Sequence, residues 1–207
     1  MTLAIDLNDV LRDYTGQFKE YYIKAIDPDF TIEDDDITSF HYSEVFPFDC
    51  ENDYLQFRYV DYPFELCGKA PMCDNMLQYR FGDWIQNTLK DLDEEKVPDV
   101  MIVSALESPL TIQATYHFLS VRQLRVRETY FPTDSSTIWD KCDILITANP
   151  NLLSNVPEGK VAIRIEMPYN KDIECKYSFK SLMDVILDKD ETVINILDNN
   201  GESLKEE

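Results

Sequence analysis

The chain has 207 residues, of which 44% are hydrophobic, so it is long enough to bury one sizeable core together with a small satellite domain. Its formal net charge at pH 7 is −21, from 40 acidic and 19 basic side chains. A surface of this sign repels nucleic acid and anionic membranes, and it favours basic partners. We therefore expect protein partners or a homo-oligomer, and we expect neither nucleic acid nor a membrane as a partner.

The five cysteines are scattered and form no C-x-x-C pair. This pattern favours reduced thiols over a disulfide framework or a zinc site. The sequence does not begin with a basic region followed by an apolar stretch, and it contains no apolar run of membrane-spanning length. We therefore expect the protein to be cytoplasmic at synthesis.

The chain begins with a strand pattern. Residues 3–5 are apolar and are followed by Asp6, which predicts a buried strand that ends in an acid. Open α/β folds place their chemistry at this end of parallel strands. From Leu11 onward, apolar side chains recur at helical spacing and predict a helix that ends near residues 27–29.

The next segment is rich in aromatic residues and leads to a boundary. Residues 40–64 show neither strict alternation nor a helical stripe, so we expect short helices and irregular turns there. Apolar residues at helical spacing then predict a helix over residues 77–92. The polar run at residues 91–96 indicates a boundary.

In the second half of the chain, strand patterns alternate with helix patterns. Ser108 and Pro109 open one predicted helix, and Ser178 is the expected cap of another. This alternation predicts an α/β fold with a doubly wound parallel sheet. Besides residues 3–6, the predicted strands are residues 99–104, 126–131, 143–147, 161–165 and, at the sheet edge, 192–197.

The segment between the first two strands is too long for a simple crossover. We interpret it as a helical cap inserted into the core domain. The expected division is a core formed by residues 1–13 and 97–200, a cap at residues 14–96 and an acidic tail at residues 201–207.

Several segments together resemble a known family. Residues 6–10 (Asp-Leu-Asn-Asp-Val) resemble motif I of the haloacid dehalogenase (HAD) superfamily of phosphatases, which reads D-x-D-x-[TV]. Ser104 matches motif II. Residues 143–152 are similar to motif IV of the 5′(3′)-deoxyribonucleotidase (cytosolic type C) branch, usually D-I-L-I-D-D-x-P-x-x-L, and residues 162–170 are similar to that branch's P-Y-N segment. The resemblance implies a HAD-like Rossmannoid core with a small helical cap after the first strand.

The same resemblance shows which functional residues are replaced. In the family the first aspartate attacks phosphorus, and Asp6 holds that place. The second aspartate is the general acid and base, and here it is Asn8, which cannot titrate; losing such help costs roughly 10²- to 10⁴-fold in rate. The motif IV aspartates help to hold Mg²⁺, and their places are taken by Thr147 and Ala148. Ser104 is retained at the place of the family's phosphate ligand.

Two further positions bear on the chemistry. The family's phosphate-binding lysine has no clear counterpart, because Lys141 precedes the motif IV strand and is expected at its wrong end. Asp9 and Glu166 are the available stand-ins for the missing acid. Asp9 occupies the family's usual glycine place, where the backbone turns.

The leading interpretation is a catalytically inactive pseudoenzyme with a structural or interaction role and no cofactor. Relatives of the branch are frequent in phage genomes, so a virion or assembly component is one form of this role. The alternative is a divergent Mg-dependent phosphatase acting on deoxynucleoside monophosphates, and a third interpretation is a protein that binds a phosphorylated small molecule without cleaving it. The cap aromatics then either stack on a base or form the cap's own core.

Overall fold

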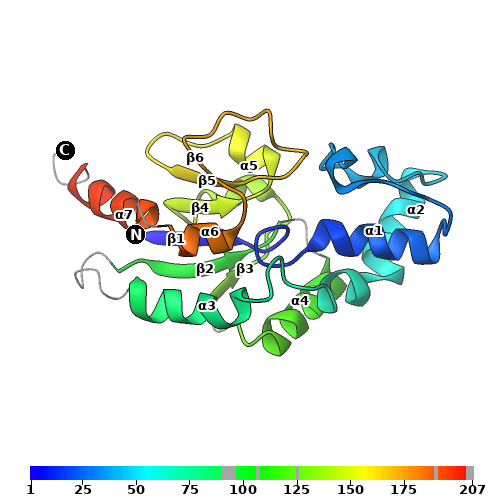
Figure 1. The fold of residues 1–207 in the computed structure, drawn as a ribbon, viewed down its shortest axis with the longest axis horizontal. Coiled ribbons are helices and arrows are strands. Elements are labelled where there is room, and N and C mark those ends of the chain that lie inside the picture. The colour runs from blue at the N-terminus through cyan, green and yellow to red at the C-terminus, as the bar shows by residue number, and fades with distance from the viewer. Residues whose placement is uncertain (90–96, 106–107, 125, 189–190, 204–207) are drawn as a thin grey trace.

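The computed structural model describes residues 1–89, 97–105, 108–124, 126–188 and 191–203. In this part of the chain, six strands form one parallel sheet in the order β3-β2-β1-β4-β5-β6 (Figure 1). The strands are β1 (Thr2–Asp6), β2 (Asp99–Val103), β3 (Glu128–Tyr130), β4 (Ile144–Thr147), β5 (Val161–Ile165) and β6 (Tyr177–Phe179). The predicted α/β fold with a doubly wound parallel sheet is confirmed.

Strand β1 lies at the centre of the sheet. Its residue Ile5 is fully buried and pairs in register with Ile102 of β2 and Ile146 of β4. On one side of β1 the strand order runs to β2 and β3, and on the other side it runs to β4, β5 and β6. Because ligands of open α/β sheets bind where the strand order reverses, the end of β1 at Asp6 is the expected position of a site.

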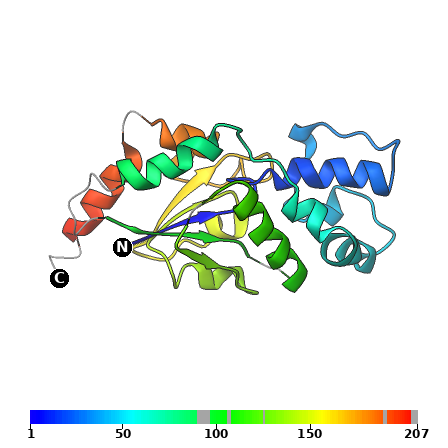
Figure 2. The same ribbon diagram turned by 90° about the horizontal axis from the view of Figure 1, so that it is seen from below.

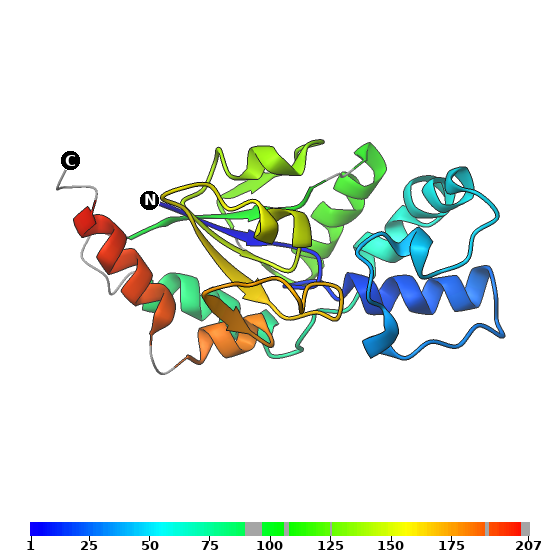
Figure 3. The same cartoon turned by 90° about the horizontal axis from the view of Figure 1, so that it is seen from above.

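Helices cover both faces of the sheet. Helices α3, α6 and α7 lie together on one face and bury their apolar side chains against Ile5 and Ile146 (Figures 2 and 3). On the other face, α5 and the 3₁₀ helix η6 pack against Ala4 and Leu145. The bounds are η6 (Ser135–Ile138), α3 (Leu77–Asp83), α4 (Pro109–Val121), α5 (Pro150–Ser154), α6 (Leu182–Ile186) and α7 (Thr192–Ser203).

The helices within residues 14–71 form a lobe at one end of the molecule (Figure 1). We call residues 14–71 the cap. Phe18 lies at the centre of its aromatic cluster, with ring centroids 4.8 Å from Tyr42 and 5.3 Å from Phe57. These aromatic side chains therefore pack against one another. The cap elements are α1 (Tyr14–Ala25), the 3₁₀ helices η1 (Asp34–Asp36) and η2 (Tyr42–Glu44), α2 (Glu51–Gln56), and the π-helices η3 (Phe57–Asp61) and η4 (Phe64–Gly68).

The next helix packs with the sheet instead of with the cap. The segment predicted as one helix forms α3 followed by the π-helix η5 (Trp84–Thr88), and Leu77, Phe81 and Trp84 join the core cluster of the sheet. The polar run at residues 91–96, which we expected to mark the boundary, lies outside the described residues. We therefore propose an insertion that ends near residue 71, earlier than the residue 96 of the sequence analysis.

Two predictions near the C-terminus are wrong. Residues 192–197 are not an edge strand but the start of α7, in which Val193, Ile196 and Leu197 are buried at helical spacing. A short apolar run fits either structure, and packing on the sheet decides it. Ser178 lies in β6, so the following helix α6 is instead capped by Ser181, whose hydroxyl accepts from the Asp184 N–H.

Two expectations concern segments at the margin of the described chain. Helix α7 continues into the expected acidic tail as far as Ser203, and residues 204–207 lie outside the described part. Within the residues that the structure describes, none of the helices combines the length and the apolar composition that a membrane crossing requires.

Candidate functional site at the carboxyl edge of the sheet

Three of the predicted site residues lie at the carboxyl ends of neighbouring strands. Asp6 ends β1, Thr147 ends β4, and Ser104 follows β2 directly. The Thr147 hydroxyl donates a 2.6 Å hydrogen bond to Asp6 Oδ2. Ser104 is fully buried, and its backbone N–H donates to the Tyr130 carbonyl of β3. The structure thus places all three residues at the edge where the resemblance expects a phosphatase site.

The carboxyl group of Asp6 is buried and already bonded. Its Oδ1 accepts the Leu7 N–H at 2.8 Å, while its Oδ2 accepts the Thr147 hydroxyl. Burial raises the pKa of Asp6 to about 7, although both hydrogen bonds act in the opposite direction. Burial therefore favours the uncharged form of this carboxyl group.

Thr147 and Ala148, which stand at the expected metal-binding positions, instead form hydrogen bonds that hold the loop after β4. Besides its bond to Asp6, the Thr147 hydroxyl accepts the Asn149 N–H at 3.0 Å. Ala148 is buried, and its carbonyl accepts from the side-chain amide of Asn170. Asn149 caps the short helix α5. This loop is held by hydrogen bonds in which no motif IV carboxylate takes part.

Asn8 is held by a buried arginine that the sequence analysis missed. Its Oδ1 accepts from both Nε and Nη2 of Arg12, at 2.9 and 2.6 Å. Because these bonds occupy the amide oxygen, the amide nitrogen is the polar atom left for other partners. Arg12 stands four residues after Asn8, in a turn whose geometry the sequence did not reveal.

The neighbouring Asp9 adopts a left-handed backbone with φ of 58°, which agrees with its position at the family's usual glycine. Its carboxylate accepts hydrogen bonds from Thr15 N–H, Thr15 Oγ1 and the hydroxyls of Tyr42 and Tyr169. Burial raises the pKa of Asp9, and these bonds oppose the rise. Glu166, the other stand-in, is exposed and accepts from Ser178. Neither carboxylate lines the cavity beside Asp6.

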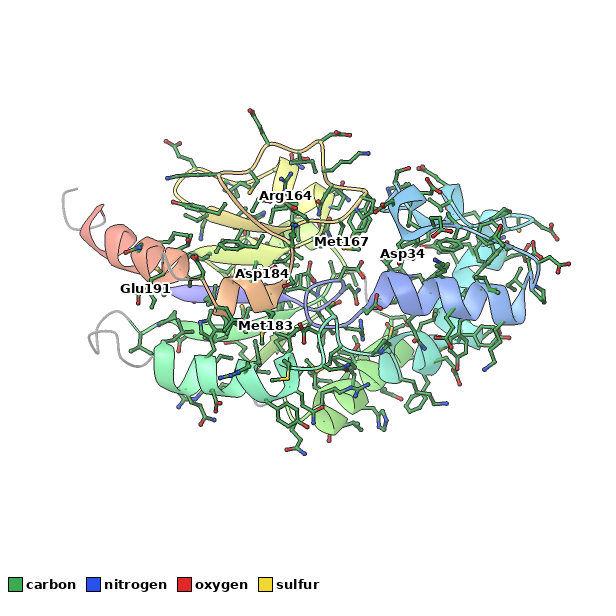
Figure 4. The ribbon with its side chains drawn as sticks, viewed as in Figure 1. Asp34, Arg164, Met167, Met183, Asp184 and Glu191 are labelled. Atoms are coloured by element: carbon green, nitrogen blue, oxygen red, sulfur yellow. The ribbon has the colours of Figure 1, made fainter. Side chains whose placement is uncertain are left out.

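The loop after β5 joins the two sides of this edge. Figure 4 labels Met167, whose N–H donates to Asn170 Oδ1, and Arg164, which donates to carbonyls of the same loop. The Asn170 amide nitrogen donates to the Ala148 and Ile165 carbonyls, after β4 and at the end of β5. The P-Y-N segment therefore ties two strand ends together.

A small cavity of about 60 Å³ opens beside Asp6. Pockets that hold drug-sized ligands are several times larger, about 300–1,000 Å³. The cap contributes Arg58 and His41 to the lining, and the sequence analysis did not select either for this site. Arg58 donates to the Tyr54 hydroxyl at 2.7 Å. The described lining residues are Asp6, Asn8, Phe40, His41, Arg58, Ala105, Asn149 and Asn151.

The donor set that the described residues form at this edge does not fit a magnesium ion. Mg²⁺ requires near-octahedral oxygen coordination and is usually held by one or two carboxylates in addition to waters and substrate. Among the described residues that line the cavity, Asp6 is the carboxylate, and one of its oxygens accepts the Thr147 proton. Lys141 does not line the cavity beside Asp6; it precedes β4 in the chain, and its ammonium lies 5.9 Å from the centroid of the Tyr130 ring.

Comparisons with known proteins give the fold. No protein-family model matches the sequence, and no curated protein matches it. One similar solved structure is described as a haloacid dehalogenase-like hydrolase from Burkholderia xenovorans LB400, with 11% identity, coverage of 92% of this chain and 96% of that chain, and a TM-score of 0.51. A second, described as a dehalogenase, has 12% identity, coverage of 88% and 94%, and a TM-score of 0.43. The likeness to the first of these structures shows the fold alone, an α/β fold like that of a HAD-like hydrolase, and the nucleotidase branch stays a prediction.

Proposed function

We propose that this chain is a HAD-fold protein that does not hydrolyse phosphate esters and that acts through contacts with other proteins. The hydrogen bond from Thr147 to Asp6 is the observation on which the first half rests. It places a neutral hydroxyl against the nucleophile at the position where the family resemblance expects a metal-binding carboxylate.

The protonation state of Asp6 supports this proposal. A carboxyl group attacks phosphorus as the carboxylate. Burial raises the pKa of Asp6 to about 7, and the Thr147 proton occupies one of its oxygens. A bound divalent cation would favour the charged form, but the donor set at this edge does not fit one.

The position of the general acid supports it independently. Asn8 has no proton to exchange, and Arg12 holds its amide oxygen by two hydrogen bonds. Asp9 is occupied by Thr15, Tyr42 and Tyr169, so it is not placed to act in place of Asn8.

The interaction role rests on the surface and the fold. A net charge of −21 favours basic protein partners. The sheet keeps its six parallel strands, whereas the expected positions of the general acid and of the metal-binding carboxylates hold Asn8, Thr147 and Ala148. A virion or assembly component is one form of this role, suggested by the family resemblance alone.

A turnover assay tests the first half of the proposal. Wild-type protein and Asp6→Asn are incubated with Mg²⁺ and either deoxynucleoside monophosphates or p-nitrophenyl phosphate, and phosphate release is measured. We expect the two proteins to give the same background rate. Turnover by the wild type that Asp6→Asn abolishes would contradict the proposal and support the divergent nucleotidase instead.

A further inference from the structure

Two hydrogen-bond networks connect the turn after β1 to the cap. The first is centred on Arg12, which is fully buried. Its Nε and Nη2 donate to Asn8, and its Nη1 donates to the Cys67 carbonyl of η4 at 3.0 Å and to Thr115 Oγ1 of α4 at 2.8 Å. One guanidinium thus joins the turn, the cap and a core helix.

The second network is centred on Asp9. Its Oδ2 accepts from Thr15 Oγ1 at 2.7 Å and lies 3.3 Å from the Tyr42 hydroxyl, both within the cap. The same oxygen accepts from the Tyr169 hydroxyl at 2.8 Å, and Tyr169 belongs to the loop after β5. The ring of Tyr169 also contacts Phe40 of the cap, at 5.5 Å between centroids. The Asp9 carboxylate therefore joins the cap to the far side of the sheet edge.

The contact between the cap and α4 is close. A Cβ atom added at Gly68 would lie 3.3 Å from the Ala114 carbonyl of α4. Arg122, which follows α4, donates to the Ala70 carbonyl at 3.2 Å. Cys67 is buried at this contact, in a cluster that includes Ala114.

We propose that Asn8, Asp9 and Arg12 form a latch that keeps the cap closed over the carboxyl edge of the sheet. Asn8, at the position of the expected general acid, and Asp9 then hold the cap in place instead of taking part in catalysis. Arg12 acts as a positioning residue that fixes Asn8, and Asp9 holds Thr15 and Tyr169 together. The latch does not depend on whether the chain hydrolyses a phosphate ester.

Native thiols report cap opening. Cys67 is buried at the contact between η4 and α4, and Cys142 is buried in the core cluster on the other face of the sheet. Alkylation of each thiol in the full-length native protein is followed by peptide mass spectrometry. Selective opening of the cap exposes Cys67 without Cys142, whereas loosening of the whole fold exposes both.

The test variants remove single hydroxyl groups. Tyr169→Phe and Thr15→Val each delete a donor to Asp9 and keep the bulk of the side chain. Tyr130→Phe is the matched control, because its hydroxyl bonds with Thr137 away from the cap. Removing one partner of a buried hydrogen bond costs enough free energy that the opening equilibrium of the cap should rise roughly tenfold.

We expect Cys67 alkylation to accelerate roughly tenfold in Tyr169→Phe and in Thr15→Val, with Cys142 unchanged and with no acceleration in Tyr130→Phe. An unchanged Cys67 rate in both latch variants would overturn the proposal. A parallel rise at Cys67 and Cys142 would overturn it as well, because it would show a general loss of stability. Thr15→Val retains the backbone bond to Asp9, so it supplies the answer if Tyr169→Phe does not fold.

Discussion

At the scale of residues, the burial and the hydrogen bonds of two aspartates, Asp6 and Asp9, determine the chemistry of the carboxyl edge. Asp6 and Asp9 are both buried, and burial raises the pKa of each. Asp6 accepts from one side-chain hydroxyl and one backbone N–H, whereas Asp9 accepts from three hydroxyls and one backbone N–H. Burial thus favours the uncharged form of Asp6, and the four hydrogen bonds of Asp9 connect the turn after β1 with the cap and with the loop after β5.

The raised pKa of Asp6 predicts a pH dependence of stability. The unfolded carboxyl titrates near 3.9, so between about pH 4 and pH 7 the native state binds more protons than the unfolded state. The free energy of unfolding should therefore fall as pH rises through this window. Relative to Asp6→Asn, the wild type should lose about 2–3 kcal/mol between pH 5 and pH 8, as measured by urea denaturation.

The exposed Asp172 provides the control for this measurement, because Asp172→Asn removes a carboxylate that is open to solvent. That variant should follow the wild-type pH dependence. If the free energy of unfolding of Asp6→Asn has the same pH dependence as that of the wild type, then burial does not raise the pKa of Asp6.

Restoring the missing acid alone should not restore chemistry. In Asn8→Asp, the new carboxylate would receive both Arg12 hydrogen bonds, which lower the pKa of a carboxyl group and keep it ionised. An ionised group cannot protonate a leaving alcohol. We expect phosphate release by Asn8→Asp to equal that of the wild type, and Mg-dependent turnover by this single variant would refute this interpretation.

The sequence showed which residue types stand at the motif positions, but not which side chains from other segments would lie beside them. Asn8, Thr147 and Ala148 stand at recognisable motif positions, so their lack of carboxylates was visible directly. Arg12 and Arg58 were missed, because their roles depend on how a turn and a cap segment fold back toward Asp6. Nothing in their local pattern distinguishes them from solvated charges.

At the scale of elements, the central strands of the sheet were predicted best. The apolar runs that form β1 and β4 are bounded by polar residues and are buried on both faces, as parallel strands are. Helix α4 was recognised from Ser108 and Pro109, and the structure shows the full capping box. The segments after β5 were harder to predict from the sequence. Strand β6 has three residues, and the choice between strand and helix for α7 depends on packing against the sheet.

Asn170 predicts an effect at the element scale, because one buried side chain connects the ends of β4 and β5. Asn170→Ala removes the partner of two carbonyls and of the Met167 N–H. We expect the free energy of unfolding to fall by about 2–3 kcal/mol in urea denaturation. Asn155→Ala, which removes one exposed bond to Asn151, should cost less than about 0.5 kcal/mol. Equal losses in the two variants would show that Asn170 does not connect the strands.

At the scale of the whole molecule, the net charge and the lobed shape bear on partners. The cap forms a separate lobe at one end of the sheet (Figure 1), and its described surface includes the acidic 3₁₀ helix η1. A charge of −21 favours a basic surface and weakens association with an equally acidic one. Association with a basic partner should weaken as salt rises.

The interaction role predicts an assembly. Native mass measurement of the protein recovered from its source should show a symmetric oligomer or a complex of fixed stoichiometry. A stable interface of this kind buries about 1,200–2,000 Å² in total. A monomer, with no partner recovered at low or moderate salt, would count against the role.

Our proposal that the carboxyl edge does not bind Mg²⁺ is tested most directly by the response of the free energy of unfolding to this ion. The free energies of unfolding of the wild type and Asp6→Asn are measured with and without millimolar Mg²⁺ at constant ionic strength. A site that binds the ion at a hundredfold excess over its Kd would add about 2.7 kcal/mol to the wild type alone. We expect the two proteins to respond equally to Mg²⁺, and a larger, saturable stabilisation of the wild type would show that Asp6 still holds the ion.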